Sequence, residues 1–219
     1  MIKNIIFDFD GVLVDSEILV ARAFSKYLEN LGITFGEKDF ANLAGKKTIE
    51  VIDILSQRFV IKDQKVFYDD IMNIASNIYK KELITVNGAY EFVSKSKLKL
   101  FIGSNSIKDR IVDGLKRVGL DKYFDDDQVY SFDLVKNPKP YPDVYLKAIS
   151  DNNLNKNETI IIEDSAVGVM AGVSAKVRVI GITAGGHWHA QRDKKELVDA
   201  GAITVTNNYS QISKIIENF

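Results

Sequence analysis

Two carboxylates lie two residues apart in the segment Phe7-Asp8-Phe9-Asp10-Gly11, where a short apolar run ends. Side chains alternate along an extended segment, so Asp8 and Asp10 would point to the same side. Their charges would repel each other unless a cation or a proton compensates them. A hard divalent ion such as Mg²⁺ suits oxygen ligands that have no His or Cys nearby. The pair therefore predicts a magnesium site, and the alternative is an acidic turn, because Asp-Gly pairs are common in turns.

Further polar residues follow later apolar segments. Ser104 ends one such segment, Lys139 lies between two prolines, and Glu163-Asp164 ends another. Each has an ordinary alternative: Ser104 and Ser106 are good helix caps, a loop lysine is usually solvated, and acidic residues are favoured where a helix begins. At the ends of parallel strands, however, these groups would meet in the crevice where such sheets bind ligands. Their joint occurrence predicts one catalytic site.

The elements that would position these residues are strands and helices in alternation. Several segments are almost wholly apolar and rich in Ile and Val, which is typical of strands covered on both faces of a parallel sheet. They are Asn4–Phe9, Leu98–Gly103, Thr159–Ile162, Val177–Ile182 and Ala202–Thr206. Helical patterns separate the later ones, and we expect Ser106 to cap the helix that Gly119 closes. The alternation predicts an α/β fold with a doubly wound parallel sheet.

One stretch departs from this alternation. The helical patterns Glu17–Leu31, Ile49–Phe59 and Val66–Lys81 follow the first strand with no strand between them. A right-handed crossover between parallel strands needs only one helix. We therefore expect an inserted helical domain at residues 15–83, and a catalytic core formed by residues 1–14 and 84–219.

The composition limits the chemistry and the partners. The 219 residues include 29 Lys+Arg and 30 Asp+Glu, for a formal net charge of -1, and no Cys. The lack of Cys excludes disulfides, thiolate zinc sites and thiol nucleophiles. The near-neutral balance gives no electrostatic reason to expect nucleic acid or a membrane as partner. No apolar run approaches the ~20 residues of a membrane span and no cleavable leader is evident, so we expect a cytoplasmic protein.

The order Asp8-x-Asp10-Gly11, Ser104, Lys139 and Glu163-Asp164 resembles that of the haloacid dehalogenase-like (HAD) phosphohydrolase superfamily across essentially the whole chain. In detail, the chain is similar to the subgroup that has a helical cap after the first strand, which includes β-phosphoglucomutase and sugar-phosphate phosphatases. The resemblance implies a Rossmannoid core with an α-helical cap. It also implies Mg²⁺-dependent hydrolysis of a small phosphorylated metabolite, such as a sugar or sugar-acid phosphate.

The resemblance implies a catalytic role for three residues. Asp8 would be the nucleophile and become an aspartyl-phosphate. Asp10 would protonate the leaving group and then deprotonate the attacking water. Lys139 would stabilise charge on the nucleophile and on the transferring phosphoryl group.

Other residues would bind the metal and the phosphate. The implied Mg²⁺ ligands are Asp8, the backbone carbonyl of Asp10, Asp164, and Glu163 through a water. The implied contacts to the substrate phosphate are Gly11, Ser104 and Asn105.

Contacts to the rest of the substrate are expected from the inserted domain. Glu17 could accept hydrogen bonds from a substrate hydroxyl, and the alternative is a charge at a helix start. In related enzymes the loop corresponding to Ala44–Thr48 contributes to leaving-group recognition. Lys46 or Lys47 would then meet a second anionic group, and the alternative is two solvated lysines.

A separate segment, His187-Trp188-His189, holds both histidines and the only tryptophan. Its two imidazoles could bind a metal if the segment were extended, but no third ligand is evident. We expect instead a loop near the floor of the cleft.

Departures from the mutase pattern favour hydrolysis. β-Phosphoglucomutase-like enzymes carry a histidine near Val20 and an arginine near Thr48, and this chain has neither. A mutase must keep water away from its aspartyl-phosphate and hold a bisphosphate in two orientations. Two alternatives stay open: a phosphosugar mutase, and a protein that binds a phosphorylated metabolite without turnover. We expect a monomer or a weak dimer.

Overall fold

The computed structural model describes residues 1–36, 39–40, 43, 48–189 and 192–219. The chain divides into two compact units. The larger unit comprises Met1–Asp15 and Ile84–Phe219, and the smaller unit comprises Ser16–Leu83. No helix in the described part of the chain is both long enough and apolar enough to span a membrane.

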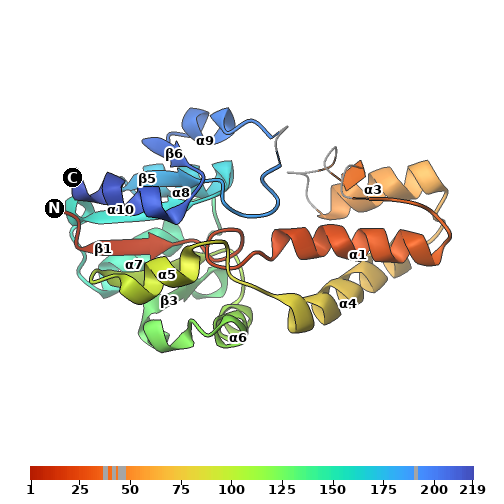
Figure 1. The fold of residues 1–219 in the computed structure, drawn as a ribbon, viewed down its shortest axis with the longest axis horizontal. Coiled ribbons are helices and arrows are strands. Elements are labelled where there is room, and N and C mark those ends of the chain that lie inside the picture. Colours follow the sequence, from red (N-terminus) through yellow and green to blue (C-terminus); the bar gives the residue numbers. More distant parts are fainter. Residues whose placement is uncertain (37–38, 41–42, 44–47, 190–191) are drawn as a thin grey trace. The chain divides into compact units, whose positions relative to one another are not determined.

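The larger unit is built on a parallel sheet whose strand order is β3-β2-β1-β4-β5-β6 (Figure 1). The strands are β1 (Asn4–Phe7), β2 (Lys99–Ser104), β3 (Val129–Ser131), β4 (Thr159–Glu163), β5 (Arg178–Ile182) and β6 (Thr204–Thr206). The central strand β1 pairs with β2 on one side and β4 on the other, so that Ile5 lies between Leu100 and Ile160. This confirms the predicted α/β fold with a parallel sheet.

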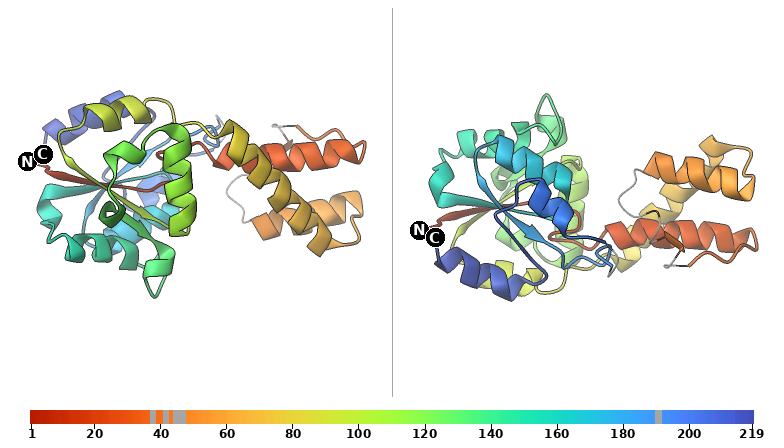
Figure 2. Two further views of the ribbon diagram at one scale, coloured as in Figure 1. Left: turned by 90° about the horizontal axis from the view of Figure 1, so that it is seen from below. Right: turned by 90° about the horizontal axis from the view of Figure 1, so that it is seen from above.

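Helices cover both faces of the sheet, as Figure 2 shows. They are α5 (Ala89–Lys95), α6 (Lys108–Val118), α7 (Asp143–Asp151), α8 (Ala166–Ser174), α9 (Lys195–Asp199) and α10 (Tyr209–Glu217). Short 3₁₀ turns lie at Asp121–Tyr123, Asp126–Gln128, Phe132–Leu134 and Lys156–Glu158.

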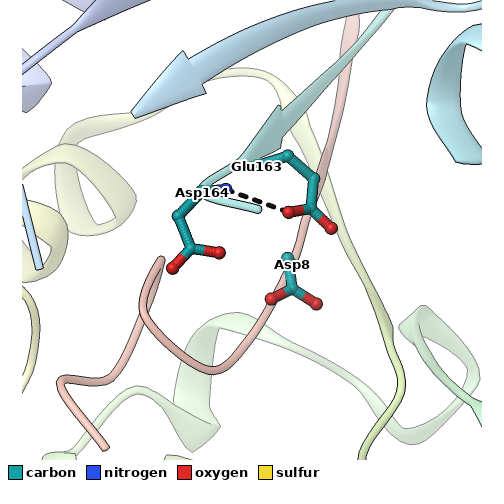
Figure 3. Close-up of side chains that lie close together, drawn as sticks. All are labelled: Asp8, Glu163 and Asp164. Carbon is teal, nitrogen blue, oxygen red and sulfur yellow. Dashed lines mark hydrogen bonds between the residues drawn. The ribbon is translucent and has the colours of Figure 1, made fainter. Parts of the chain in front are cut away.

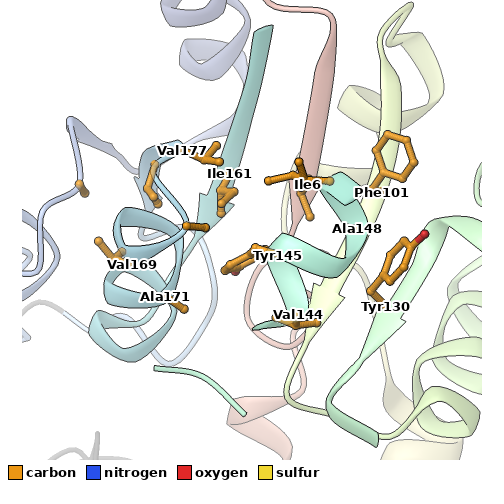
Figure 4. Close-up of a cluster of buried hydrophobic side chains, with 14 of the residues drawn as sticks. Ile6, Phe101, Tyr130, Val144, Tyr145, Ala148, Ile161, Val169, Ala171 and Val177 are labelled. Atoms are coloured by element: carbon orange, nitrogen blue, oxygen red, sulfur yellow. The ribbon is translucent and has the colours of Figure 1, made fainter. Parts of the chain in front are cut away.

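Neighbouring residues of β1 show how the two faces are filled. Ile6 packs with Tyr145 of α7 and Val169 of α8 in one buried cluster (Figure 4). The Phe7 ring contacts the ring of Phe92 in α5 at 6.1 Å between centroids. Because adjacent side chains of a strand point to opposite faces, the nearly continuous apolar sequence of β1 is explained by burial on both sides.

The start of α6 differs from the sequence prediction. Gly119 closes the helix with φ 70°, as expected. The residue before the first turn is Ile107, which makes no capping hydrogen bond through its side chain, so the predicted cap at Ser106 is wrong. The Ser106 hydroxyl bonds Asp10 instead.

The smaller unit contains α1 (Glu17–Asn30), α3 (Thr48–Phe59) and α4 (Gln64–Glu82). The Phe24 ring of α1 meets the Phe67 ring of α4 edge to face, at 5.9 Å between centroids. Asp63 caps α4 by accepting a hydrogen bond from the backbone N–H of Val66 at 3.0 Å. These contacts give the smaller unit an apolar interior of its own.

The two segments of the larger unit that flank Ser16–Leu83 pair with each other. The Asp15 N–H donates to the Ile84 carbonyl at 3.0 Å, and the Val86 N–H donates to the Leu13 carbonyl at 3.1 Å. Val14 and Thr85 form an antiparallel bridge between these bonds. The outgoing and returning chain therefore form a short two-stranded ladder.

Candidate active site

Three carboxylates from two neighbouring strands meet at the carboxyl edge of the sheet. Asp8 follows β1, Glu163 ends β4, and Asp164 is the next residue. β1 and β4 are paired in register, so their ends lie side by side. One oxygen from each carboxylate lies within 4.8 Å of the others, and all three residues are buried (Figure 3). The sheet thus brings together acidic groups that lie far apart in the sequence.

Lys139 supplies a positive charge to these acids. Its ammonium lies 2.7 Å from Asp8 Oδ1 and 2.6 Å from Glu163 Oε1, and only 6% of the residue is exposed. Its backbone is held by Asn105, whose side-chain oxygen accepts from the Lys139 N–H at 2.8 Å and whose amide donates to the Lys139 carbonyl at 3.2 Å. The Asn105 side chain therefore fixes the segment that carries the lysine.

The acids of this cluster outnumber its nearby cations. Burial raises the pKa of Asp8 well above its usual value; Glu163 and Asp164 add to this, and Lys139 opposes it. Burial and then Glu163 likewise raise the pKa of Asp164. Burial acts to lower the pKa of Lys139, but Asp8 and Glu163 outweigh it and raise the pKa, so the ammonium keeps its charge. A buried group of oxygens whose negative charge is only partly offset fits a hard divalent cation.

Glu163 is the acceptor for most of the surrounding donors. Its Oε1 accepts from Lys139 Nζ at 2.6 Å and from the Tyr145 hydroxyl at 2.9 Å. Its Oε2 accepts from the Asp164 N–H at 2.9 Å, the Ser165 N–H at 3.1 Å and the Ser165 hydroxyl at 3.0 Å. A carboxylate offers about four lone-pair directions, so these donors occupy its capacity. Glu163 is therefore arranged to orient Lys139 and Asp164.

The start of α8 is shaped around the Glu163 carboxylate. The Ser165 hydroxyl caps the helix by accepting from the Gly168 N–H at 3.0 Å. A Cβ at Gly168 would overlap the carboxyl group of Glu163. Glycine is required here because the buried acid occupies the space of a side chain.

Asp10 lies at the rim of the site, with 18% of its side chain exposed. Its Oδ2 accepts from the Ser106 hydroxyl at 2.5 Å, and its Oδ1 lies 2.8 Å from Arg110 Nη2. The buried Ser104 hydroxyl accepts from the Ser106 N–H at 3.0 Å and so shapes the turn after β2. The loop between β2 and α6 therefore holds Asp10.

Gly11 makes room for Asp164. Its φ is 78°, and a Cβ there would overlap the Asp164 carboxylate.

The Asp164 carboxylate also contacts the loop after β5: its Oδ2 lies 2.9 Å from His187 Nε2. His187 belongs to the loop after β5, and the N–H of Gly186 in that loop donates to both carboxylate oxygens of Asp15 at 3.0 Å. The loop thus links Asp164 to the last residue before the smaller unit.

Two of the expected substrate contacts, Glu17 and Lys47, belong to the smaller unit. Glu17 lies in the first turn of α1 and its side chain is exposed. Lys47 lies outside the described residues.

Sequence reasoning missed several contacts of this site. Tyr145 lies in a helical apolar pattern, so nothing marks its hydroxyl as a partner of Glu163. The sequence marks His187 only as one of a histidine pair, and its partner Asp164 is distant in sequence. Arg110 could have been found, because a positive charge in the first turn of a helix is unfavourable and indicates an acidic partner.

Comparison with known proteins gives a consistent result. The family model for haloacid dehalogenase-like hydrolases matches residues 5–182. The phosphorylated carbohydrates phosphatase of Thermotoga maritima is 33% identical over 93% of both chains. The 6-phosphogluconate phosphatase of Escherichia coli is 27% identical over 85% of both chains. A HAD family hydrolase of Deinococcus radiodurans, solved with bound phosphate and sodium, superposes with a TM-score of 0.86 at 25% identity, covering 99% of this chain and 96% of that one.

The fold, the acidic cluster at the carboxyl edge of the sheet and these similarities agree with one another. The family match covers most of the sequence, and the Thermotoga relative aligns over nearly its whole length. The chain belongs to the haloacid dehalogenase-like hydrolase family and is a phosphatase of that family.

Proposed function

We propose that this phosphatase is a Mg²⁺-dependent phosphomonoesterase that hydrolyses a sugar or sugar-acid phosphate through an aspartyl-phosphate on Asp8. The observation that carries the proposal is the contact of Lys139 with both Asp8 and Glu163, beside Asp164. A buried carboxylate held against an ammonium, next to further acids, suits a nucleophile that must approach a phosphate dianion.

The proposed chemistry proceeds in two displacements. An Asp8 oxygen forms a bond to phosphorus while the bond to the leaving oxygen breaks, and that oxygen takes a proton from Asp10. A water molecule then attacks phosphorus, Asp10 takes its proton, and inorganic phosphate leaves as the Asp8 carboxylate is restored. Lys139 stays bonded to Asp8 and offsets negative charge in both displacements. In this proposal the substrate phosphate contacts Ser104 at the end of β2, the adjacent Asn105, and Gly11 in the turn after β1.

The residues proposed to hold Mg²⁺ are Asp8, Asp164 and the Asp10 backbone carbonyl. The contact of Glu163 through a water, which the resemblance implies, is not part of the proposal, because protein donors occupy both of its oxygens. The fit rests on the buried, oxygen-only cluster and its excess of negative charge. Bound there, the ion would reduce the repulsion between the phosphate dianion and the nucleophile. Because the oxygens of Glu163 already accept from protein donors, its main contribution in this proposal is to orient Asp164 and Lys139.

The choice of substrate class rests on the relatives. The phosphatases named above act on phosphorylated carbohydrates and on 6-phosphogluconate, and the Deinococcus structure contains phosphate. We propose that residues 15–83 serve as the cap and select the leaving group, with Glu17 and Lys47 as its contacts to substrate hydroxyl and anionic groups. The expected cytoplasmic location and the monomeric or weakly dimeric state stay predictions.

A panel of phosphate esters tests this function. Phosphate release would be measured from p-nitrophenyl phosphate, hexose phosphates, 6-phosphogluconate and pyrophosphate, with Mg²⁺ or with EDTA. We expect the highest kcat/KM on a sugar or sugar-acid phosphate, no activity with EDTA, and a loss of at least about 10³-fold in Asp8→Asn, because the nucleophile is removed. Activity that survives in Asp8→Asn would contradict the assignment of Asp8.

The same panel separates the two alternatives. A phosphosugar mutase would yield an isomerised sugar phosphate that depends on a bisphosphate primer and little free phosphate. A binding protein would bind a sugar phosphate tightly without turnover. Either outcome would replace the proposed hydrolysis.

A further inference from the structure

Both oxygens of Asp10 are held by residues of one loop and helix. Oδ2 accepts from the Ser106 hydroxyl at 2.5 Å, and Oδ1 lies 2.8 Å from Arg110 Nη2. Contacts to both oxygens, made by two separate side chains, fix the plane of the carboxylate as well as its position. We call Ser106 and Arg110 together the Asp10 clasp.

The position of Arg110 on its helix needs this partner. Arg110 lies in the first turn of α6, where the helix dipole presents positive charge and disfavours a cation. Lys108, also in the first turn, likewise has an acidic partner, Asp126 at 2.8 Å. Lys116 and Arg117 lie in the last turn, where a cation is favoured. Arg117 also pairs with Asp113 one turn away, at 2.6 Å. The ion pair with Asp10 therefore offsets an unfavourable placement.

The backbone beneath the clasp is itself anchored. The Ser106 N–H donates to the buried Ser104 hydroxyl at 3.0 Å, and the Lys108 N–H donates to Asp133 Oδ1 at 3.2 Å. Ile111 is fully buried one turn into α6. The start of α6 is therefore held in place, and Ser106 and Arg110 in turn hold the Asp10 carboxylate, which would otherwise rotate about its side-chain bonds.

We propose that Arg110 is a positioning residue that, with Ser106, holds the Asp10 carboxylate in the orientation required for proton transfer to the leaving group. The inference rests on the proposed function, in which Asp10 is the acid and base. The clasp contacts both oxygens, so it sets the direction in which the carboxylate presents its proton.

The proposal has a kinetic signature that depends on the leaving group. A basic leaving oxygen needs the proton from Asp10, whereas p-nitrophenolate departs readily without one. Phenyl phosphate and p-nitrophenyl phosphate have the same ring and differ mainly in this respect. Misplacing Asp10 should therefore lower kcat/KM for phenyl phosphate far more than for p-nitrophenyl phosphate.

The experiment compares both substrates in Arg110→Ala, Arg110→Lys and Asp10→Asn. Arg117→Ala is the matched control, because it removes an arginine from the solvent side of the same helix. We expect Arg110→Ala to lose about 10- to 100-fold in kcat/KM for phenyl phosphate, since small misplacements of catalytic groups cost up to about 100-fold, and less than about 3-fold for p-nitrophenyl phosphate. Arg110→Lys should lose less, and Arg117→Ala should match the parent enzyme on both substrates.

Two further measurements exclude a general structural effect. Millimolar guanidinium should restore phenyl phosphate hydrolysis in Arg110→Ala but not in Asp10→Asn. Combining Arg110→Ala with Asp10→Asn should give no loss beyond that of Asp10→Asn alone, because residues that act through one group are not additive. Thermal unfolding of each variant checks that it is folded, and Arg110→Lys keeps the charge if Arg110→Ala is unstable.

Failure of the inference and failure of the proposed function can be told apart. If Asp10→Asn loses phenyl phosphate hydrolysis selectively while Arg110→Ala behaves like Arg117→Ala, gains activity or loses both substrates equally, the positioning role is overturned and the acid role of Asp10 stands. If Asp10→Asn keeps the parent ratio of the two substrates, Asp10 is not the acid, and the proposed mechanism fails first.

Discussion

Glu163 is the residue through which the charged groups of the site are held together. It is fully buried, and it accepts hydrogen bonds from Lys139, Tyr145 and the start of α8. A buried acid is tolerated only when it is paired and hydrogen-bonded, and removal of one partner leaves the others without compensation. The energetic role of Glu163 is therefore larger than that of an exposed acid.

We predict that Glu163→Gln lowers the free energy of unfolding by about 3–5 kcal/mol, because the buried Lys139 loses one of its two carboxylate partners and an amide nitrogen would face N–H donors. Equilibrium urea unfolding measures the change. Glu158→Gln is the control, because Glu158 pairs with Lys3 at 2.8 Å on the surface, where the lysine side chain is 63% exposed. Its loss should cost less than about 1 kcal/mol. Equal stabilities for the two variants would contradict this account.

For individual residues, the sequence indicated the charged side chains of the site but not the residues that contact them. Asp8, Glu163 and Asp164 lie at strand ends that the parallel sheet brings together. Lys139 reaches them from the loop before α7. The contact between Tyr145 and Glu163 depends on how far α7 lies from the sheet, which no local pattern specifies. Contacts of this kind become visible only once the packing of helices on the sheet is known.

The loop after β5 connects the acidic cluster to a fluorescent side chain, that of Trp188. His187 Nε2 lies 2.9 Å from Asp164 Oδ2, and the imidazole lies 5.9 Å from the Trp188 ring between centroids. The Arg192 guanidinium lies 3.8 Å from the centre of the Trp188 ring. Asp164 is therefore connected through His187 to Trp188, the single tryptophan of the chain.

We predict that adding Mg²⁺ changes the fluorescence of Trp188, because a cation at Asp164 competes with His187 for the same carboxylate and shifts the neighbouring indole. The measurement is a fluorescence titration, which reports binding without turnover. In Asp164→Asn the saturable change should disappear. A parent spectrum that stays constant at Mg²⁺ concentrations that support activity would show that the loop does not respond to the metal.

The elements themselves were predictable where their patterns are long or strongly apolar. β1, β4 and β5 are buried on both faces and read as continuous runs of Ile and Val. β3 has only three residues and was missed, because so short a strand has no periodicity of its own. The Ser106 cap was predicted from local propensity, and the tertiary bond to Asp10 displaced it.

Among the residues that the structure describes, the acidic cluster that could hold a cation, Asp8, Glu163 and Asp164, belongs to the larger unit. We predict that Mg²⁺ at 100 times its dissociation constant stabilises the protein by about 2.7 kcal/mol, because it binds the folded form alone. Thermal unfolding with Mg²⁺, compared with Na⁺ at equal ionic strength, measures this effect and controls for screening. Asp164→Asn should lose the increment, and an equal response to both salts would exclude specific binding.

The ladder between the segments that flank Ser16–Leu83 has a mechanical consequence. Asp15 is bonded to Ile84 and also accepts from Gly186, and Val86 is bonded to Leu13. The outgoing and returning segments are thus bonded to each other, and Asp15 also bonds the loop after β5. A force on residues 16–83 would therefore act first on the Asp15–Ile84 and Val86–Leu13 hydrogen bonds rather than on the backbone of Asp8 and Asp10.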